Sequence, residues 1–250
     1  MKWGLMIAVL TLPTAAQAQL RLSDAETMLA GESADEVMFA IESMAELGNA
    51  AIRPLKARIE SGLPPDHLQA AIRTLVQLEA RREGALFTAL ARHRNEGVRA
   101  AALDALAALR IRGAGETLSA ALGDGSPIVR ATAALGLGAL GDRNHMDRLF
   151  TALDRNVLEA AQAIGQIAEG DDIDRLLGYL GRISFDSLTP AFQELFARSN
   201  VNERTKFRLV GQLAELSTPG VRAYLLELAD FTNEEAVADA ARSAAMRIAE

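Results

Sequence analysis

The chain has no cysteine, only three histidines and few aromatic residues, namely eight Phe, two Tyr and one Trp among 250 residues. The lack of cysteine excludes disulfides, thiolate metal sites and a cysteine nucleophile. Alanine and leucine instead supply 84 of the 250 residues, and both are strong helix formers, whereas the residues that strands favour are scarce. The composition therefore predicts an all-α protein, and its apolar content excludes a disordered chain.

Long apolar runs are also missing, except for one stretch at the start of the chain. A short positive start precedes apolar residues at 3–12, and the small residues Ala16 and Ala18 follow Pro13. This order is typical of a cleavable signal peptide and is too short to span a bilayer permanently. We expect residues 1–18 to be a signal peptide and the mature protein to be periplasmic. A buried N-terminal helix is the alternative interpretation.

The chain lacks net positive charge as well. Without residues 1–18 it carries 25 basic and 33 acidic side chains, a formal charge of −8. An acidic exported protein is a poor candidate for binding nucleic acid. The balance is uneven, because residues 53–112 carry eleven basic and six acidic side chains, whereas residues 113–250 carry thirteen and twenty.

Helix-start signals recur along the chain. Two Ser-x-x-Glu capping boxes begin at Ser23 and Ser33, and three Ser/Thr-Pro pairs place a capping hydroxyl before a proline. These pairs are Ser126-Pro127, Thr189-Pro190 and Thr218-Pro219. Together with the amphipathic stretches between them, the signals predict helix pairs at about 49–80, 84–110, 114–140, 144–168, 171–198 and 219–249. A further helix at about 203–216 does not keep the alternation.

An internal repeat runs through these stretches with a period near thirty. The apolar residues Val37, Leu68, Val98, Val129 and Leu158 are separated by 31, 30, 31 and 29 residues. A small residue follows each by three positions, at Ala40, Ala71, Ala101, Thr132 and Ala161. A unit of this size cannot bury its own apolar face, so stacking on an equivalent neighbour must do it. We expect Ala71, Ala101, Ala133 and Ala161 to be buried between repeats.

The stretches 52–71 and 124–136 resemble HEAT repeats, with an early proline in the first helix, a turn aspartate, Val-Arg and Ala-Leu-Gly. The resemblance implies an α-α superhelix, a solenoid of paired antiparallel helices. It also implies a ladder between repeats, made by an aspartate and an arginine six positions later, and Asp124 and Arg130 match it. The ladder is mostly missing elsewhere, since His93 precedes Arg99 where an aspartate belongs. We expect regular repeats over residues 19–182 and a less regular cap over residues 183–250.

No pattern of residues in the sequence supports a catalytic, cofactor or metal site. Residues 136–141 spell Gly-x-Gly-x-x-Gly, but they fall within a predicted helix and lack the preceding strand of a dinucleotide loop. His67, His93 and His145 lack zinc-ligand spacing and are expected to be solvated near turns. The acidic residues at 169–174 favour a helix start more than a calcium loop. No Gly-x-Ser-x-Gly element is present to activate a serine.

One feature indicates a partner-binding edge. Arginines occur in successive loops that each join the second helix of one repeat to the first helix of the next. They are Arg81, Arg82, Arg110 and Arg112. Equivalent loops of a solenoid stack along one edge, and arginine suits carboxylates and phosphates. The alternative is that these arginines only keep an exposed edge solvated.

The function we expect is an exported scaffold, without catalysis of its own, that binds an exported or membrane-anchored protein, since solenoids present extended binding surfaces. The resemblance leaves a second possibility open. Some HEAT-like proteins resemble bilin lyases, which would imply an accessory or lyase-like protein acting on a cofactor-bearing partner.

Overall fold

The structure, a computed structural model, describes residues 21–248. The predicted signal peptide lies outside the described residues. Between residues 21 and 248 the chain forms helices and turns, with a single isolated bridge between Leu180 and Ile183. The all-α prediction is confirmed. No helix in this part of the chain is long and apolar enough to cross a membrane.

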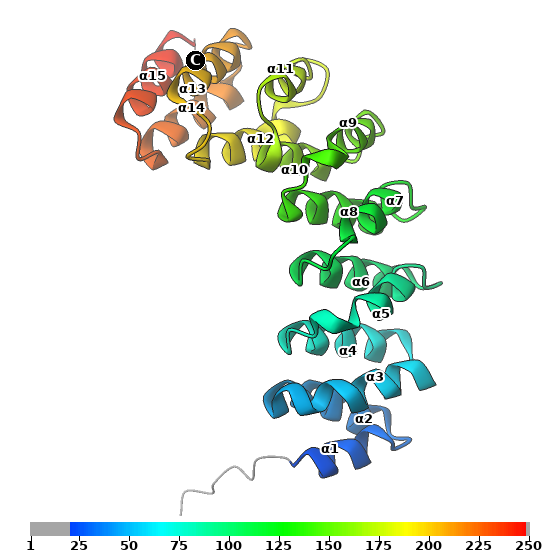
Figure 1. Ribbon diagram of the computed structural model, residues 1–250. Helices are drawn as coiled ribbons and strands as arrows, with labels where there is room; N and C mark the ends of the chain where they lie inside the picture. Colours follow the sequence, from blue (N-terminus) through cyan, green and yellow to red (C-terminus); the bar gives the residue numbers. More distant parts are fainter. Residues whose placement is uncertain (1–20, 249–250) are drawn as a thin grey trace, which may run out of the picture.

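The helices alternate in direction and stack in layers (Figure 1). The first layer consists of α1 (Leu22–Leu29), α2 (Ala34–Ser43) and the short helix η1 (Met44–Ala51). Five pairs follow: α3 (Ile52–Ser61) with α4 (Pro65–Gln77), α5 (Gly84–Leu90) with α6 (Glu96–Ala108), α7 (Ala114–Ala121) with α8 (Pro127–Leu140), α9 (Met146–Asp154) with α10 (Glu159–Ile167), and α11 (Asp171–Leu177) with α12 (Phe185–Ala197).

The chain ends in α13 (Glu203–Glu215), α14 (Pro219–Phe231) and α15 (Glu235–Arg247), and one-turn helices η2 (Arg81–Glu83) and η3 (Arg143–His145) lie in loops. The predicted pairs are thus confirmed, and α13 is the helix that breaks the alternation.

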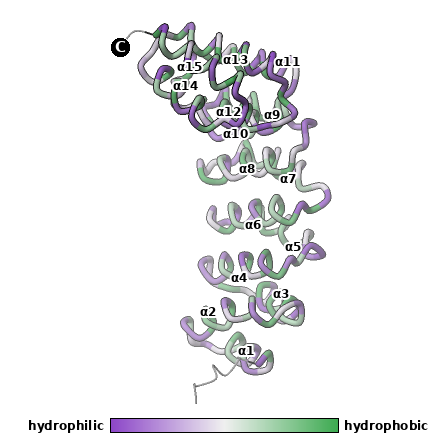
Figure 2. Tube along the Cα trace, turned by 90° about the vertical axis from the view of Figure 1, so that its left-hand side faces the viewer, coloured by the Kyte–Doolittle hydropathy of each residue, from purple (hydrophilic) through white to green (hydrophobic). Residues whose placement is uncertain are grey.

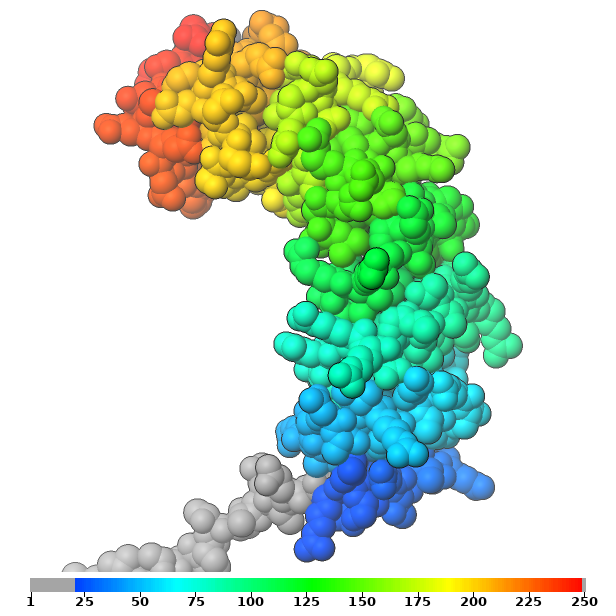
Figure 3. Space-filling view, in the orientation of Figure 1, coloured from blue at the N-terminus to red at the C-terminus, as the bar shows by residue number. Residues whose placement is uncertain are grey.

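The second helices of the pairs form the spine of the stack. Each of α4, α6, α8, α10 and α12 packs on the next, and Figure 2 shows α4, α6 and α8 as successive layers. The whole molecule is an arch whose C-terminal helices overhang one side (Figure 3). We call that side the inner side of the arch, and the overhanging helices α12 to α15 the hook.

Three of the five predicted helix starts are confirmed and two are wrong. Helix α8 begins at Pro127 directly after Ser126, although the Ser126 side chain makes no capping hydrogen bond. The side chains of Ser33 and Thr218 accept hydrogen bonds from the third residue of their helices. Ser23 lies inside α1, which begins at Leu22. Pro190 lies inside α12, because Ser184 caps that helix five residues before Thr189 and brings Phe185 into its first turn.

Small residues set the spacing of the layers. Ala71, Ala133 and Ala161 are fully buried, as predicted, but Ala101 is only half-buried, whereas its neighbour Ala102 is fully buried. The buried face of α6 is formed by Val98, Ala102 and Leu103 among others, and Ala101 falls at the margin of that face.

The glycine run 136–141 serves packing, not nucleotide binding. A Cβ at Gly136 would press on Leu118, and one at Gly138 would press on Ala163 of the next layer. Both glycines lie inside α8, and Gly141 ends that helix in the left-handed conformation, which glycine adopts without steric cost. The run therefore brings three helices close together.

Aromatic side chains pack the helices of the hook against one another. Phe185 of α12 meets Phe192 of the same helix and Tyr224 of α14, with ring centroids 6.2 and 5.5 Å apart. In α13, Lys206 is fully buried and bonded to Glu234. The packing partners of α13 and α14 include α15, so the C-terminal helices form a small bundle.

Candidate protein-binding surface

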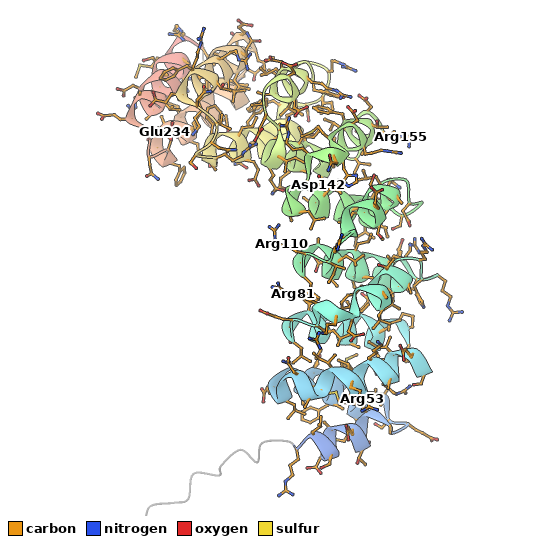
Figure 4. All side chains as sticks on the ribbon, in the orientation of Figure 1. Arg53, Arg81, Arg110, Asp142, Arg155 and Glu234 are labelled. Carbon is orange, nitrogen blue, oxygen red and sulfur yellow. The ribbon has the colours of Figure 1, made fainter. Side chains whose placement is uncertain are left out.

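The loops that follow α4, α6 and α8 lie on the inner side of the arch. Figure 4 shows Arg81, Arg110 and Asp142, one from each of these loops, one above the other on that side, whereas Arg155 lies on the opposite side. Arg81, Arg82 and Arg112 are exposed, and no hydrogen bond or ion pair to another side chain is found for them within the described chain. The structure thus places Arg81 and Arg110 on a common edge.

Arg110 has a structural task that the sequence did not suggest. Its guanidinium donates to the carbonyls of Ala139 and Leu140 at 3.0 and 3.2 Å, the last turn of α8 in the next repeat. Carbonyls at a helix C-terminus lack intrahelical donors, and a cation there also meets the negative end of the helix dipole. Arg110 therefore stabilises the junction between two repeats.

The inner edge becomes acidic farther along the stack. The loop after α8 carries Asp142 and Arg143, and Arg143 pairs with Glu169 at 2.9 Å and Asp172 at 2.6 Å. Arg208 pairs with Asp174 at 2.6 Å. Arginines thus balance the acidic residues at 169–174, and no group of metal-ligating side chains occurs within residues 21–248. The arginines Arg81, Arg82 and Arg112, in the loops after α4 and α6, have no such acidic partner within the described chain.

The ladder expected of HEAT repeats has one clear rung. Arg99 donates to both carboxylate oxygens of Asp124, at 2.9 and 2.7 Å, and to the carbonyl of His93 at 2.9 Å. Arg130 donates to the backbone carbonyl of Asp124 at 2.8 Å. The hydrogen bonds from Arg99 hold the pKa of the Asp124 carboxyl below its ordinary value. Because the pair joins consecutive repeats, it ties the loop before α6 to the loop before α8.

The histidines are engaged in packing. The Nε2 atom of His67 lies 2.8 Å from the carbonyl oxygen of Ala34, and Nδ1 of His93 accepts a hydrogen bond from the backbone of Asn95. His145 is buried, against the expectation of a solvated side chain, because it packs over Gly115, where no Cβ occupies the space. Each histidine therefore closes a turn or a gap between helices.

A groove crosses the exposed faces of α4, α6 and α8, and the sequence did not reveal it. Its volume is about 490 Å³, and its walls include Val76 and Gln77 of α4, Ala101 of α6 and Ile128 of α8. Ile128 is 55% exposed and Leu135, seven residues later in α8, is 38% exposed. Residues seven apart lie on one face of a helix, so α8 presents two aliphatic side chains to the solvent beside small residues.

Comparison with known proteins agrees with this architecture. The family model of HEAT repeats matches residues 83–164, and this segment of the chain consists of HEAT repeats. The fold is an α-α superhelix. A search of curated proteins finds no match.

Among solved structures, the complex of CpcE and CpcF of phycocyanin lyase from a Nostoc species is similar. Its TM-score is 0.53 at 18% identity, over 97% of this chain and 100% of that one. A designed armadillo repeat protein matches with a TM-score of 0.37 at 18% identity, over 92% and 100% of the two chains.

Proposed function

We propose that the protein is an exported scaffold that binds a partner protein through the groove and the adjoining basic loops. The observation that carries the proposal is that these two surfaces meet at the end of α4. Gln77 lines the groove, and the exposed Arg81 and Arg82 follow it within five residues. A surface that joins exposed aliphatic side chains to unpaired arginines suits an amphipathic helix that carries acidic residues on one margin.

The residues of the groove support this kind of partner. Small side chains such as Ala101 allow a helix backbone to come close, and Ile128 offers an apolar contact from the α8 wall. Exposed arginines steer an acidic partner toward the surface and make its binding depend on salt. No group needed for catalysis enters the proposal.

Capture of partners from periplasmic extract, with identification by mass spectrometry, tests the proposal. We expect one protein to be retained by the wild type and lost both by Ile128→Asp and by the triple variant Arg81→Gln, Arg82→Gln, Arg112→Gln. The matched control for Ile128→Asp is Phe39→Asp, since Phe39 is 54% exposed in α2. The control for the arginines is a triple variant of Arg92, Arg94 and Arg155 to Gln, because these arginines are exposed in loops that join the two helices of one pair. Equal loss with test and control variants would contradict the proposal.

Export has a separate test. If residues 1–18 are a signal peptide, the protein from its native cells begins at or near Gln19 and fractionates with the periplasm. Intact-mass analysis decides the matter, and a chain that retains Met1 in the cytoplasmic fraction would refute export while leaving the binding surface untouched.

A second candidate function follows from the likeness to the CpcE and CpcF complex of phycocyanin lyase. The protein would then act on a cofactor-bearing partner as an accessory or lyase-like subunit. Its test is the visible absorbance of the partner before and after incubation with this protein. An unchanged spectrum, with binding intact, favours the scaffold.

A further inference from the structure

A second cavity lies in the hook, between α12 and α14. Its volume is about 540 Å³, and its walls include Phe196 of α12 and Tyr224, Glu227 and Phe231 of α14. Tyr224 reaches across to α12, where its ring lies 6.4 Å from that of Phe196, centroid to centroid. The cavity is therefore framed by three aromatic side chains and opens beside a carboxylate.

The hydroxyl of Tyr224 is the unusual group in this wall. The side chain is 94% buried, since only 6% remains exposed, and its hydroxyl oxygen has no hydrogen-bond partner in the described chain. Leaving a buried hydroxyl without a partner is unfavourable. Burial and the nearby charge of Glu227 raise the pKa of Tyr224, so the group stays a neutral hydroxyl, which donates one hydrogen bond and accepts others.

The surroundings of the cavity carry an excess of acidic side chains. Residues 227–239 include five acidic side chains and no basic one. Glu234 is bonded to the buried Lys206 and Asp239 pairs with Arg242, whereas Glu227 is exposed and no ion pair is found for it within residues 21–248. Phe231 is 78% exposed at the mouth of the cavity. An exposed phenyl ring next to a free carboxylate attracts a cation, because the ring face is electronegative.

We infer that the cavity in the hook binds the guanidinium group of an arginine side chain presented by a protein partner. A guanidinium has several N–H donors in one plane, so it can donate to the Tyr224 oxygen and the Glu227 carboxylate and still stack on Phe231. Arginine fits better than lysine because its planar guanidinium can donate two hydrogen bonds side by side and stack on an aromatic ring, whereas an ammonium is a compact, strongly hydrated charge. The inference rests on the proposed function, since it names a side chain that the partner would carry.

The test uses the full mature protein and three peptides of ten residues that differ at one central position. This position is arginine, lysine or citrulline, the last having the shape of arginine without its charge. Amide chemical shifts are followed by NMR as each peptide is added. We expect saturating shifts in α12 and α14 with the arginine peptide, weaker binding with lysine and none with citrulline.

Variants then assign the binding to the cavity. Tyr224→Phe and Glu227→Gln should each weaken the arginine peptide about tenfold, and Phe231→Ala should do the same. Glu46→Gln and Phe39→Ala are the matched controls and should bind as the wild type does, since Glu46 is exposed and no ion pair is found for it between residues 21 and 248. Tyr224→Phe should melt at the same temperature as the wild type or higher, because the hydroxyl that it removes has no partner.

The outcomes separate this inference from the proposed function. Equal binding of the citrulline and arginine peptides, or unchanged binding by Tyr224→Phe and Glu227→Gln, would overturn the inference. Ile128→Asp in the groove should leave the arginine peptide unaffected while it abolishes partner capture. If the groove variants lose partner capture but the wild type does not bind the arginine peptide, the proposed scaffold function stands and the arginine-binding cavity is refuted.

Discussion

At the scale of single residues, arginine side chains hold the repeats together in ways that residue type alone does not show. Arg99 joins two repeats through Asp124, and Arg110 joins two repeats through backbone carbonyls of α8. The sequence predicted Asp124 as part of a ladder, because the turn motif marks it. It predicted Arg110 only as a surface charge, because the carbonyls that it meets lie about thirty residues away and only the stacking brings them near.

Loss of the Arg99–Asp124 pair should lower stability at neutral pH and matter less in acid. The pair is largely shielded, with side chains 17% and 18% exposed, so Asp124→Ala should cost about 1.5–3 kcal/mol. Because the folded chain holds the pKa of Asp124 below 3.8, this stabilisation is present above that pH and is lost as the pH falls through the lowered value.

Urea unfolding at pH 7 and at successively lower pH measures the effect. The control is Asp147→Ala, because the Asp147 carboxylate that pairs with Arg175 is 94% exposed, and exposed pairs contribute at most about 1 kcal/mol. A difference between wild type and Asp124→Ala that did not shrink in acid would contradict the assignment.

Arg110 should contribute to the stability of the fold, whereas the other three arginines of the edge should not. Arg110→Gln should lower the melting temperature, since it removes donors from the last turn of α8, at a cost of about 1 kcal/mol. The triple variant of Arg81, Arg82 and Arg112 to Gln should melt like the wild type, because these side chains are exposed and solvated charges contribute little. Thermal unfolding by circular dichroism compares the two, and equal melting points would remove the structural role of Arg110.

At the scale of elements, the helices were predictable and their rotations were not. Caps, prolines and the thirty-residue period placed the pairs near their observed bounds, since these signals are local. Which side of α6 faces the next layer depends on the packing of three helices at once. That rotation buries Ala102 and leaves Ala101 at the groove, which no periodicity in the sequence reveals.

The two neighbouring alanines give a direct test of this rotation. Ala102→Phe should destabilise by about 1–3 kcal/mol or prevent folding, because overpacking a filled core forces side chains and backbone apart. Ala101→Phe should cost less than this and should weaken partner capture, because its ring fills the groove. Chemical unfolding measures the first effect and extract capture the second. A larger loss of stability at residue 101 than at residue 102 would show that α6 is rotated otherwise.

At the scale of the whole molecule, contacts run mainly between neighbouring layers, and this arrangement should make stability local. In a solenoid the free energy of unfolding is approximately a sum over repeats and their interfaces. A cavity in the hook should therefore loosen the hook without loosening the far end of the stack. Leu213 of α13 and Leu75 of α4 are both fully buried leucines, so Leu213→Ala and Leu75→Ala are matched substitutions at opposite ends.

Hydrogen exchange read by mass spectrometry should resolve the two ends. Leu213→Ala should speed exchange in α13 to α15 and leave α2 to α4 protected, whereas Leu75→Ala should do the reverse, each at a cost of about 2–5 kcal/mol in its own region. The reason is that a truncated leucine removes contacts only from the layers beside it. If either variant sped exchange equally along residues 21–248, the arch would unfold as one cooperative unit. A partner bound at one end of the arch would then also stabilise the opposite end.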